Sequence, residues 1–381
     1  MTLAFLGPVF FLCKSATHCA TLSNLLRYNI VKKCVFLCSL LSNNMKKGVS
    51  QRDIARLLGV NVSTVSRALK GQPGVSPDLK QKITELANER GYRPNPFAMS
   101  LRYGATRTLG IVVPDISFSH YAHIVKWIEM EARNNGYMCI ITDSGDKYVN
   151  EVECVERLMD MHVEGIAICL SQETTDFTHI KRLKDGNIPV VLFDRVADID
   201  CPMVNFNDVE SARQATLHLI DSGAQRIAYL GGPNRIKQAS DRKHGYLEAL
   251  KERRRPIKKE LVKCGHVSFN SGLSDTLELL SLPEPPDAIL ADFGLLTHAA
   301  FQAIVSKGLR IPQDISIIGF MSDWVSGMSY PRMTFVKQNQ RDMGRKTAKL
   351  LLDQINGNTS IKHIVLNAQL NIRESTSPLK T

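Results

Sequence analysis

The most restrictive feature of the sequence is an alternation of short apolar, β-prone runs with segments of helical period, repeated through residues 104–381. Strands that alternate with helices predict parallel sheets covered by helices on both faces. The runs number about twice what one doubly wound sheet needs, so we expect two α/β lobes with a ligand cleft where the carboxyl ends of strands meet. The seven runs lie at 109–114, 138–142, 165–170, 188–194, 226–231, 288–292 and 315–320.

Positive charge is concentrated ahead of this α/β region. The 381-residue chain has a net charge of +11. Residues 1–44 carry four basic side chains and no acidic one, and residues 45–103 carry eleven basic and four acidic ones. A basic segment before a neutral body predicts a module that binds a polyanion, with nucleic acid as the first candidate and a membrane surface as the second.

The first 44 residues fit neither a signal peptide nor a membrane anchor. The apolar stretch 3–13 has no charged residue before it and is too short to span a bilayer, and the stretch 34–41 is shorter still. We expect residues 1–44 to be a non-native or disordered extension, with translation beginning at Met45. The nine cysteines include no CxxC pair, which is typical of a reduced, cytoplasmic protein.

The following segment, residues 45–92, has the spacing of an all-α helix-turn-helix domain. A capping-box-like start at Ser50 predicts a helix over 51–58, and Gly59 permits the left-handed turn that ends it. Asn61 is a suitable N-cap for a second helix, and a third helix follows. This arrangement is that of a DNA-binding helix-turn-helix, in which the second helix enters the major groove.

Short hydrogen-bond donors and cations occupy the predicted outward positions of the second helix. Such side chains suit phosphate oxygens and the base edges of a major groove. The alternative is an ordinary helical hairpin, whose solvated face would more often mix Glu with Lys. The outward positions are Ser63, Thr64, Ser66, Arg67 and Lys70.

Residues 93–103 predict a short hinge helix with Asn95 as its N-cap. An isolated helix of this length does not repay the cost of nucleation, so it needs a partner. We expect that partner to be the same helix of a second subunit together with the DNA minor groove. Leu101 would then be the apolar wedge, Ala98 would pack the two helices closely and Arg102 would lie near phosphates. The alternative is a plain interdomain linker.

The segment from residue 49 to residue 102 resembles the lactose and galactose repressor family of bacterial transcription regulators. The matching residues are Asp53-Ile54-Ala55, Gly59-Val60, Thr64-Val65-Ser66-Arg67, Val75-Ser76, Gly91-Tyr92, Pro94-Asn95 and the hinge from Ala98 to Leu101. The resemblance implies base reading by Val62, Ser63 and Arg67, phosphate contacts by Asn61, Thr64 and Ser66, and a minor-groove lever at Leu101.

The resemblance continues to residues 373–376 and implies a periplasmic-binding-protein fold for residues 104–381. The implied core binds the effector and dimerises, and the chain crosses between its two lobes near residues 205, 333 and 364. The residues that match family ligand positions are the stacking pair His120 and Tyr121, the central cleft arginine Arg242, and Asp292 and Gln338.

The sequence departs from the family pattern after Gly319-Phe320. Many members place an Asp there that accepts hydrogen bonds from the effector, whereas this chain continues Met321-Ser322-Asp323-Trp324. Either Ser322 or Asp323 takes over this role, or the effector differs.

Motifs for catalysis and for metal binding are missing from the sequence. The turn Leu230-Gly231-Gly232-Pro233 lacks the spacing of a nucleotide-phosphate loop. His120 and His123 have no Cys or carboxylate at metal spacing, and no GxSxG or HExxH occurs. We therefore expect no enzymatic activity, no cofactor, no metal and no catalytic residue.

These observations lead to one hypothesis, a cytoplasmic, homodimeric transcription regulator that binds a near-palindromic double-stranded DNA operator and no membrane. It would repress carbohydrate-utilisation genes under the control of a small-molecule effector, a sugar, in the cleft. The alternatives are a solute-binding transport protein, a purine-responsive regulator of the same fold, and a sugar- or nucleotide-processing enzyme.

Overall fold

The computed structural model describes residues 49–92 and 106–376, apart from 323–325, 328, 359 and 361. The chain divides close to residue 98 into an N-terminal unit and a larger C-terminal unit. The expected extension and the expected hinge helix lie outside the described residues.

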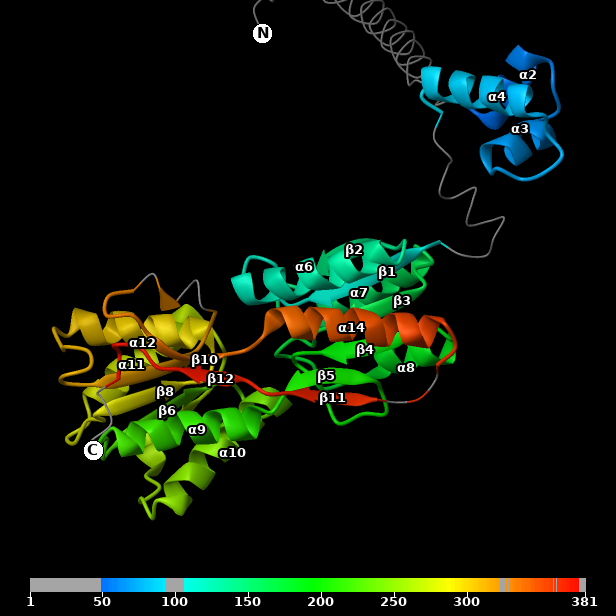
Figure 1. Cartoon of the computed structure of the whole chain (residues 1–381). Coiled ribbons are helices and arrows are strands. Elements are labelled where there is room, and N and C mark those ends of the chain that lie inside the picture. The colour runs from blue at the N-terminus through cyan, green and yellow to red at the C-terminus, as the bar shows by residue number, and fades with distance from the viewer. Residues whose placement is uncertain are drawn as a thin grey trace, which may run out of the picture. The chain divides into compact units, whose positions relative to one another are not determined.

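Three helices, which Figure 1 labels, make up the N-terminal unit. They are α2 (Gln51–Leu58), α3 (Val62–Leu69) and α4 (Pro77–Glu89). Each contributes one fully buried apolar side chain to the centre of the unit, namely Ile54, Val65 and Ile83. The small core therefore forms because the apolar positions recur on one side of each helix.

Local hydrogen bonds fix the tight turn between α2 and α3. The Ser50 hydroxyl accepts the N–H of Asp53, and the Asp53 carboxylate accepts the N–H of Ser50, which completes a capping box. Gly59 ends α2 with a φ of 63°, a backbone conformation that favours glycine. The Asn61 side-chain oxygen accepts the N–H of Ser63 at 3.1 Å, so α3 begins one residue after its cap.

The first lobe of the C-terminal unit is built on a six-stranded parallel sheet (Figure 1). Helices cover both of its faces, which buries the central strands completely. The strand order is β11 (His363–Leu366), β5 (Met203–Phe206), β4 (Val190–Phe193), β3 (Gly165–Ile168), β1 (Thr108–Val113) and β2 (Met138–Asp143). The helices are α6 (Ser119–Asn134) and α14 (Gln340–Ile355) on one face, and α7 (Tyr148–Asp160) and α8 (Thr178–Asp185) on the other.

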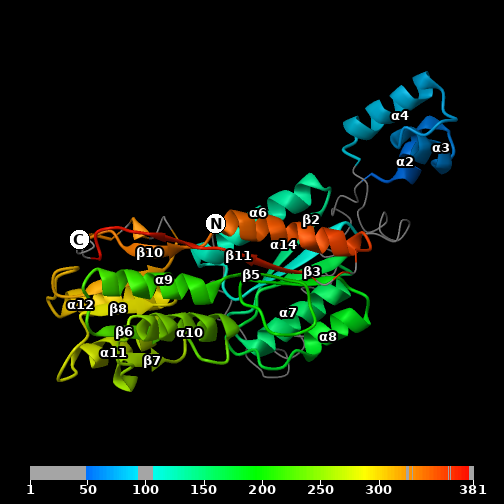
Figure 2. The ribbon, with the colours of Figure 1, turned by 60° about the horizontal axis from the view of Figure 1, so that its bottom comes forward.

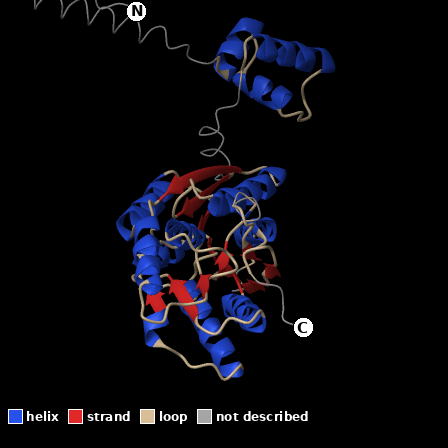
Figure 3. Ribbon diagram, turned by 90° about the vertical axis from the view of Figure 1, so that its left-hand side faces the viewer, coloured by secondary structure: helices blue, strands red, loops and turns tan. Residues whose placement is uncertain are grey.

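The second lobe repeats this design, and Figure 3 shows helices on either side of its strands. Its strand order is β12 (Gln369–Asn371), β10 (Thr334–Lys337), β9 (Ser316–Phe320), β8 (Ala288–Ala291), β6 (Ile227–Gly231) and β7 (Val262–Cys264). All neighbours are parallel except β12, which runs antiparallel to β10. The helices are α9 (Asp208–Asp221) and α10 (Lys237–Glu252) on one face, α11 (Phe269–Leu280) and α12 (Gly294–Ser306) on the other, with the short helix η1 (Lys259–Leu261) before β7.

The chain passes between the two lobes three times (Figure 2). It crosses from β5 to α9 at residue 207, from β10 to α14 at 338–339, and from β11 to β12 at 367–368. These positions lie a few residues after the expected ones, because β5, β10 and β11 occupy the chain there and the sequence analysis did not identify these strands. The sequence expectation of two lobes of parallel sheet is confirmed.

Candidate functional site

The N-terminal unit presents an exposed polar face on α3. Val62, Ser63 and Arg67 are exposed, and Thr64 is partly buried. The Asn61 side-chain oxygen accepts both the N–H and the hydroxyl of Ser63, each at 3.1 Å. The start of this helix is therefore fixed by its cap, and its exposed side chains are displayed on a rigid element.

The structure corrects the expected outward position of Ser66. This side chain is only 6% exposed, and it lies among buried residues of α3 that include Val65 and Ala68. The reason is that α3 packs against both α2 and α4, so its buried stripe is wider than the apolar spacing alone indicated. A phosphate contact by the Ser66 side chain is therefore not supported by this geometry.

Several predicted site residues fall outside the described part of the chain. Their proposed roles in DNA binding and in effector binding stay predictions. They are Asn95, Ala98, Leu101, Arg102 and Asp323.

The C-terminal unit contains a cavity of about 620 Å³ between its two lobes. The first lobe contributes residues that follow β1 and β4, including His120 and Arg195. The second lobe contributes the first turns of α10, among them Arg242, and residues that follow β8 such as Phe293. The cavity therefore lies where strand ends of both sheets meet, as expected for doubly wound sheets.

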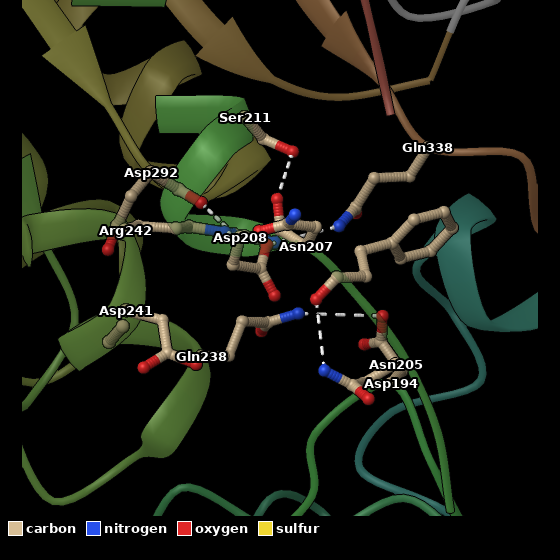
Figure 4. A network of polar contacts seen from close by, with 12 residues as sticks. Asp194, Asn205, Asn207, Asp208, Ser211, Gln238, Asp241, Arg242, Asp292 and Gln338 are labelled. Atoms are coloured by element: carbon tan, nitrogen blue, oxygen red, sulfur yellow. Dashed lines mark hydrogen bonds and ion pairs between the residues drawn. The ribbon is translucent and has the colours of Figure 1, made fainter. Parts of the chain in front are cut away.

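Arg242 is the central cation of this cleft, and Figure 4 shows it between Asp208 and Asp292. Its side chain is 2% exposed, and its Nε donates to a carboxylate oxygen of Asp208 at 2.7 Å. Its Nη1 donates to the backbone carbonyl of Asp292. The guanidinium carbon lies 4.0 Å from the ring centroid of Phe320, so an aromatic face supports the charged plane.

A second buried arginine, Arg195, also lines the cleft, and the sequence analysis did not identify it. Its Nη1 donates to Asp146 at 2.6 Å, and its guanidinium lies over the rings of Tyr121 and Phe293 at 5.8 and 5.4 Å. Its Nε is buried and has no hydrogen-bond partner among the described residues. A buried N–H of this kind is costly unless an acceptor approaches it.

The predicted stacking pair occupies one wall of the cleft. His120 and Tyr121 both line the cavity, with their ring centroids 5.2 Å apart in an edge-on arrangement. The Nε2 atom of His120 lies 3.1 Å from an oxygen of the buried Asp194. Tyr121 is 5% exposed, and its ring is covered by the Arg195 guanidinium, so it supports that cation more than it offers a free face.

Asp292 does not line the cavity, contrary to its expected role as an effector ligand. Its side chain is fully buried and accepts hydrogen bonds from the Tyr229 hydroxyl at 2.8 Å and from the N–H of Gly232 at 3.2 Å. These partners hold the carboxylate inside the second lobe, and only the Asp292 backbone carbonyl meets Arg242. The residue positions the cleft arginine from behind.

Two further predicted residues do line the cleft. Gln338 lies at the crossing from β10 to α14, and its amide nitrogen is 3.5 Å from Asp208. Ser322 follows β9, and its hydroxyl lies 3.4 Å from that of Ser119 in the opposite lobe. Both contacts are long, so both side chains retain capacity for a ligand.

Burial sets the charge state of the cleft carboxylates. Burial raises the pKa of Asp208 to about 6, although Arg242 opposes the shift, and burial likewise raises the pKa of Asp292 to about 7. Burial also acts on Asp194, but His120 and the two arginines outweigh it and leave the pKa of Asp194 below its ordinary value. Asp194 is therefore the carboxylate that stays fully charged.

One sequence signal could have found the second arginine. Asp194 and Arg195 directly follow β4, and polar residues at the carboxyl end of a buried parallel strand are placed to meet a ligand. No comparable signal marks Asp146 as the partner of Arg195, because the two are far apart in sequence and follow different strands.

The described residues contain no group of three or more His, Cys, Asp or Glu side chains that could hold a metal ion. Within that same part of the chain, no helix has the length and apolarity needed to cross a bilayer.

Two family models match the two units separately. The model described as "Bacterial regulatory proteins, lacI family" matches residues 51–95. The model described as "Periplasmic binding proteins and sugar binding domain of LacI family" matches residues 106–374.

Whole-chain relatives agree with these matches. Catabolite control protein A of Priestia megaterium is 32% identical over 85% of this chain and 98% of that protein. The probable HTH-type transcriptional repressor ExuR of Bacillus subtilis is 33% identical over 87% of this chain and its entire own length. Among solved structures, the transcriptional regulator CelR in complex with cellobiose is 29% identical, with a TM-score of 0.66 over 86% of this chain and 99% of that one.

Proposed function

The chain belongs to the LacI family of bacterial regulatory proteins, and from that premise we propose that it represses carbohydrate-utilisation genes under the control of a small carbohydrate bound in its cleft. The family establishes a DNA-binding transcription regulator. The carbohydrate effector is supported by the sugar-binding description of the core model and by a structural relative that is a cellobiose complex.

DNA recognition is assigned to the exposed face of α3. Arg67 is the exposed cation on this helix, and a guanidinium can donate two parallel hydrogen bonds to a guanine edge. In a homodimer two such helices would meet two half-sites of a near-palindromic operator about one helical turn apart.

The observation that carries the effector's role is the position of the cleft residues at the lobe crossings. Asp208, which holds Arg242, begins α9 immediately after the first crossing, and Gln338 lies at the second. A ligand that draws on these side chains acts on the segments through which one lobe moves against the other. Effector binding thereby changes the relative pose of the lobes, and the coupling to operator binding is reciprocal.

The test begins with selection of operator sequences from a random library of duplex DNA by the full chain. Enriched sequences should have dyad symmetry, and a neutral monosaccharide or disaccharide should change the affinity for the enriched duplex in fluorescence anisotropy titrations. Enrichment without an effect of any carbohydrate on operator affinity would overturn the proposed effector class. Absence of enrichment would overturn the assignment of α3.

Arg242→Ala separates the two activities. Operator binding should persist and the response to the carbohydrate should be lost, because the substitution removes the central donor of the cleft. Arg332→Ala is the matched control, since Arg332 is an exposed arginine that pairs with Glu374 and does not line the cavity.

A further inference from the structure

Each arginine in the cleft already has a buried or partly buried carboxylate partner. Arg242 is paired with Asp208 at 2.7 Å, and both side chains are 2% exposed. Arg195 is paired with Asp146 at 2.6 Å, and these side chains are 5% and 21% exposed. A ligand anion could use either guanidinium only by displacing or sharing its carboxylate.

Carboxylates outnumber cations around the cavity. The third lining cation, Lys147, is exposed at the surface, where solvent and salt screen its charge. The acidic residues are Asp115, Asp146, Glu173 and Asp194 in the lining, with Asp208 and Asp292 behind Arg242. A ligand that carried one more negative charge into this cavity would meet net repulsion in a medium that screens charge weakly.

The unsatisfied polar groups of the cleft suit hydroxyl groups. Arg195 offers a buried Nε–H without a partner, and the preceding residue, Asp194, offers an acceptor. The contacts of Asp194 with His120 and with Gln238 both fall on its Oδ1 atom. A hydroxyl both donates and accepts, so adjacent hydroxyls of one ligand can satisfy this neighbouring donor and acceptor together.

Taking the proposed function as given, we propose that the cleft selects an uncharged polyhydroxyl effector and rejects the same sugar when it carries a carboxylate or a phosphate, because both cleft arginines are already neutralised by aspartates. Displacing Asp208 or Asp146 would leave a buried carboxylate without its partner, which costs more than an exposed ion pair returns. The selectivity therefore lies in the carboxylates that hold the arginines.

Matched ligand sets measure this selectivity directly. The full chain is titrated by calorimetry at pH 7.5 with glucose, glucuronate and glucose 6-phosphate, with ribose and ribose 5-phosphate, and with cellobiose and cellobionate. We expect the neutral parent of the binding set to bind at least about tenfold more tightly than its anionic forms. An anionic member that binds as tightly as its parent overturns the inference and leaves the proposed function intact. Absence of binding by every member overturns the carbohydrate effector, and the inference with it.

Asp146→Asn tests the cause of the selectivity. The substitution removes the charge that neutralises Arg195, and Asn tolerates the positive φ of 58° at this position. The ratio of anionic to neutral affinity should rise by about tenfold or more. Asp208→Asn is the parallel variant at Arg242.

The control is Asp198→Asn, which removes the same charge from an exposed residue that pairs with Lys237 and does not line this cavity. Its affinity ratio should equal that of the unaltered protein. Circular dichroism and thermal unfolding identify any variant that fails to fold. If Asp146→Asn and Asp208→Asn both fold and neither raises the ratio above that of the control, the ion pairs do not set the selectivity and the inference is wrong. If only one of the two folds, that variant alone decides.

Discussion

Asp292 shows how burial changes the chemistry of a single residue in this core. Its carboxyl group is fully buried, accepts the Tyr229 hydroxyl, and lies behind Arg242 with a pKa raised to about 7. Burial disfavours the charged form more than the nearby guanidinium restores it. The residue is therefore close to half protonated at neutral pH, which links the stability of the second lobe to pH.

We expect the thermal stability of the core to fall as pH rises towards 7. A carboxyl group with a raised pKa holds its proton more tightly in the folded than in the unfolded protein, so the free energy of unfolding declines between about pH 4 and about pH 7 and is constant above that. Asp292→Asn keeps an acceptor for Tyr229 and should flatten this slope. Asp208 adds a smaller slope of the same sign, which persists in the variant. Melting temperatures between pH 5 and pH 8 measure the effect. Asp198→Asn is the control, and an unchanged slope in Asp292→Asn would contradict the raised pKa.

Arg67 is the residue at which base reading can be tested. If its exposed guanidinium donates to a base edge, Arg67→Ala should cost about 1 to 3 kcal/mol of operator affinity and relax the preference at one base pair of each half-site. Competition binding with duplexes that differ at single positions gives both quantities. Lys82→Ala removes the same charge from an exposed position on α4 and should leave the sequence preference intact. A preserved preference in Arg67→Ala would reassign the residue to phosphate binding.

Among the secondary-structure elements, the sequence identified those with strong periodicity or complete burial. The strands β1, β3, β4, β6, β8 and β9 are wholly buried, and their continuous apolar runs were visible. The strands β7 and β12 are three residues long and β11 is partly exposed, so none has an apolar run. Short edge strands depend on the pairing partner that the fold supplies, which a local pattern does not contain.

The cleft was predictable only in part for a related reason. The positions of Arg242 and Gln338 followed from the family resemblance, and both line the cavity. The side chain of Asp292 follows a strand end and could have faced either the cleft or the lobe interior. Tyr229, which comes from the neighbouring strand β6, decides this orientation by donating its hydroxyl. Such a choice between two faces depends on tertiary contacts that no spacing in the sequence reveals.

The predicted hinge helix is the element on which operator affinity should depend most. A helix of about seven residues is marginal alone, so its formation relies on its partners. Leu101→Ala should weaken operator binding and leave the affinity for the effector unchanged, because the substitution removes the apolar wedge without touching the cleft. Anisotropy titrations with the selected duplex and calorimetry with the effector give the two affinities. Equal losses in both would count against the lever role. Leu57→Ala, at an exposed leucine of α2, is a control for the loss of an apolar side chain.

For the molecule as a whole, the poses of the two lobes are linked across the cleft by Gln172. In the second lobe, Arg235 donates its Nε–H to the Gln172 backbone carbonyl at 2.8 Å, and Val267 donates its N–H to the side-chain oxygen at 3.0 Å. In the first lobe, the N–H and side-chain amide of Gln172 donate to Asp146 at 2.8 and 2.9 Å. Because Asp146 also holds Arg195, one residue joins the contact between the lobes to the charge arrangement of the cleft.

Gln172→Ala should therefore weaken effector binding although the residue is removed from Arg242. The variant loses the bond from Val267 and one bond to Asp146, and a typical hydrogen bond contributes about 1 kcal/mol, so the lobe pose that binds the effector becomes less populated. The apparent dissociation constant rises in inverse proportion to that population, by about fivefold for each kcal/mol. Calorimetry with the effector identified by the operator titrations measures this change. Gln214→Ala, at an exposed glutamine of α9 that donates to Glu210 outside the cleft, should leave the dissociation constant unchanged. If Gln172→Ala also leaves it unchanged, the contact between the lobes does not control their pose, and closure depends on the ligand and the three crossings alone.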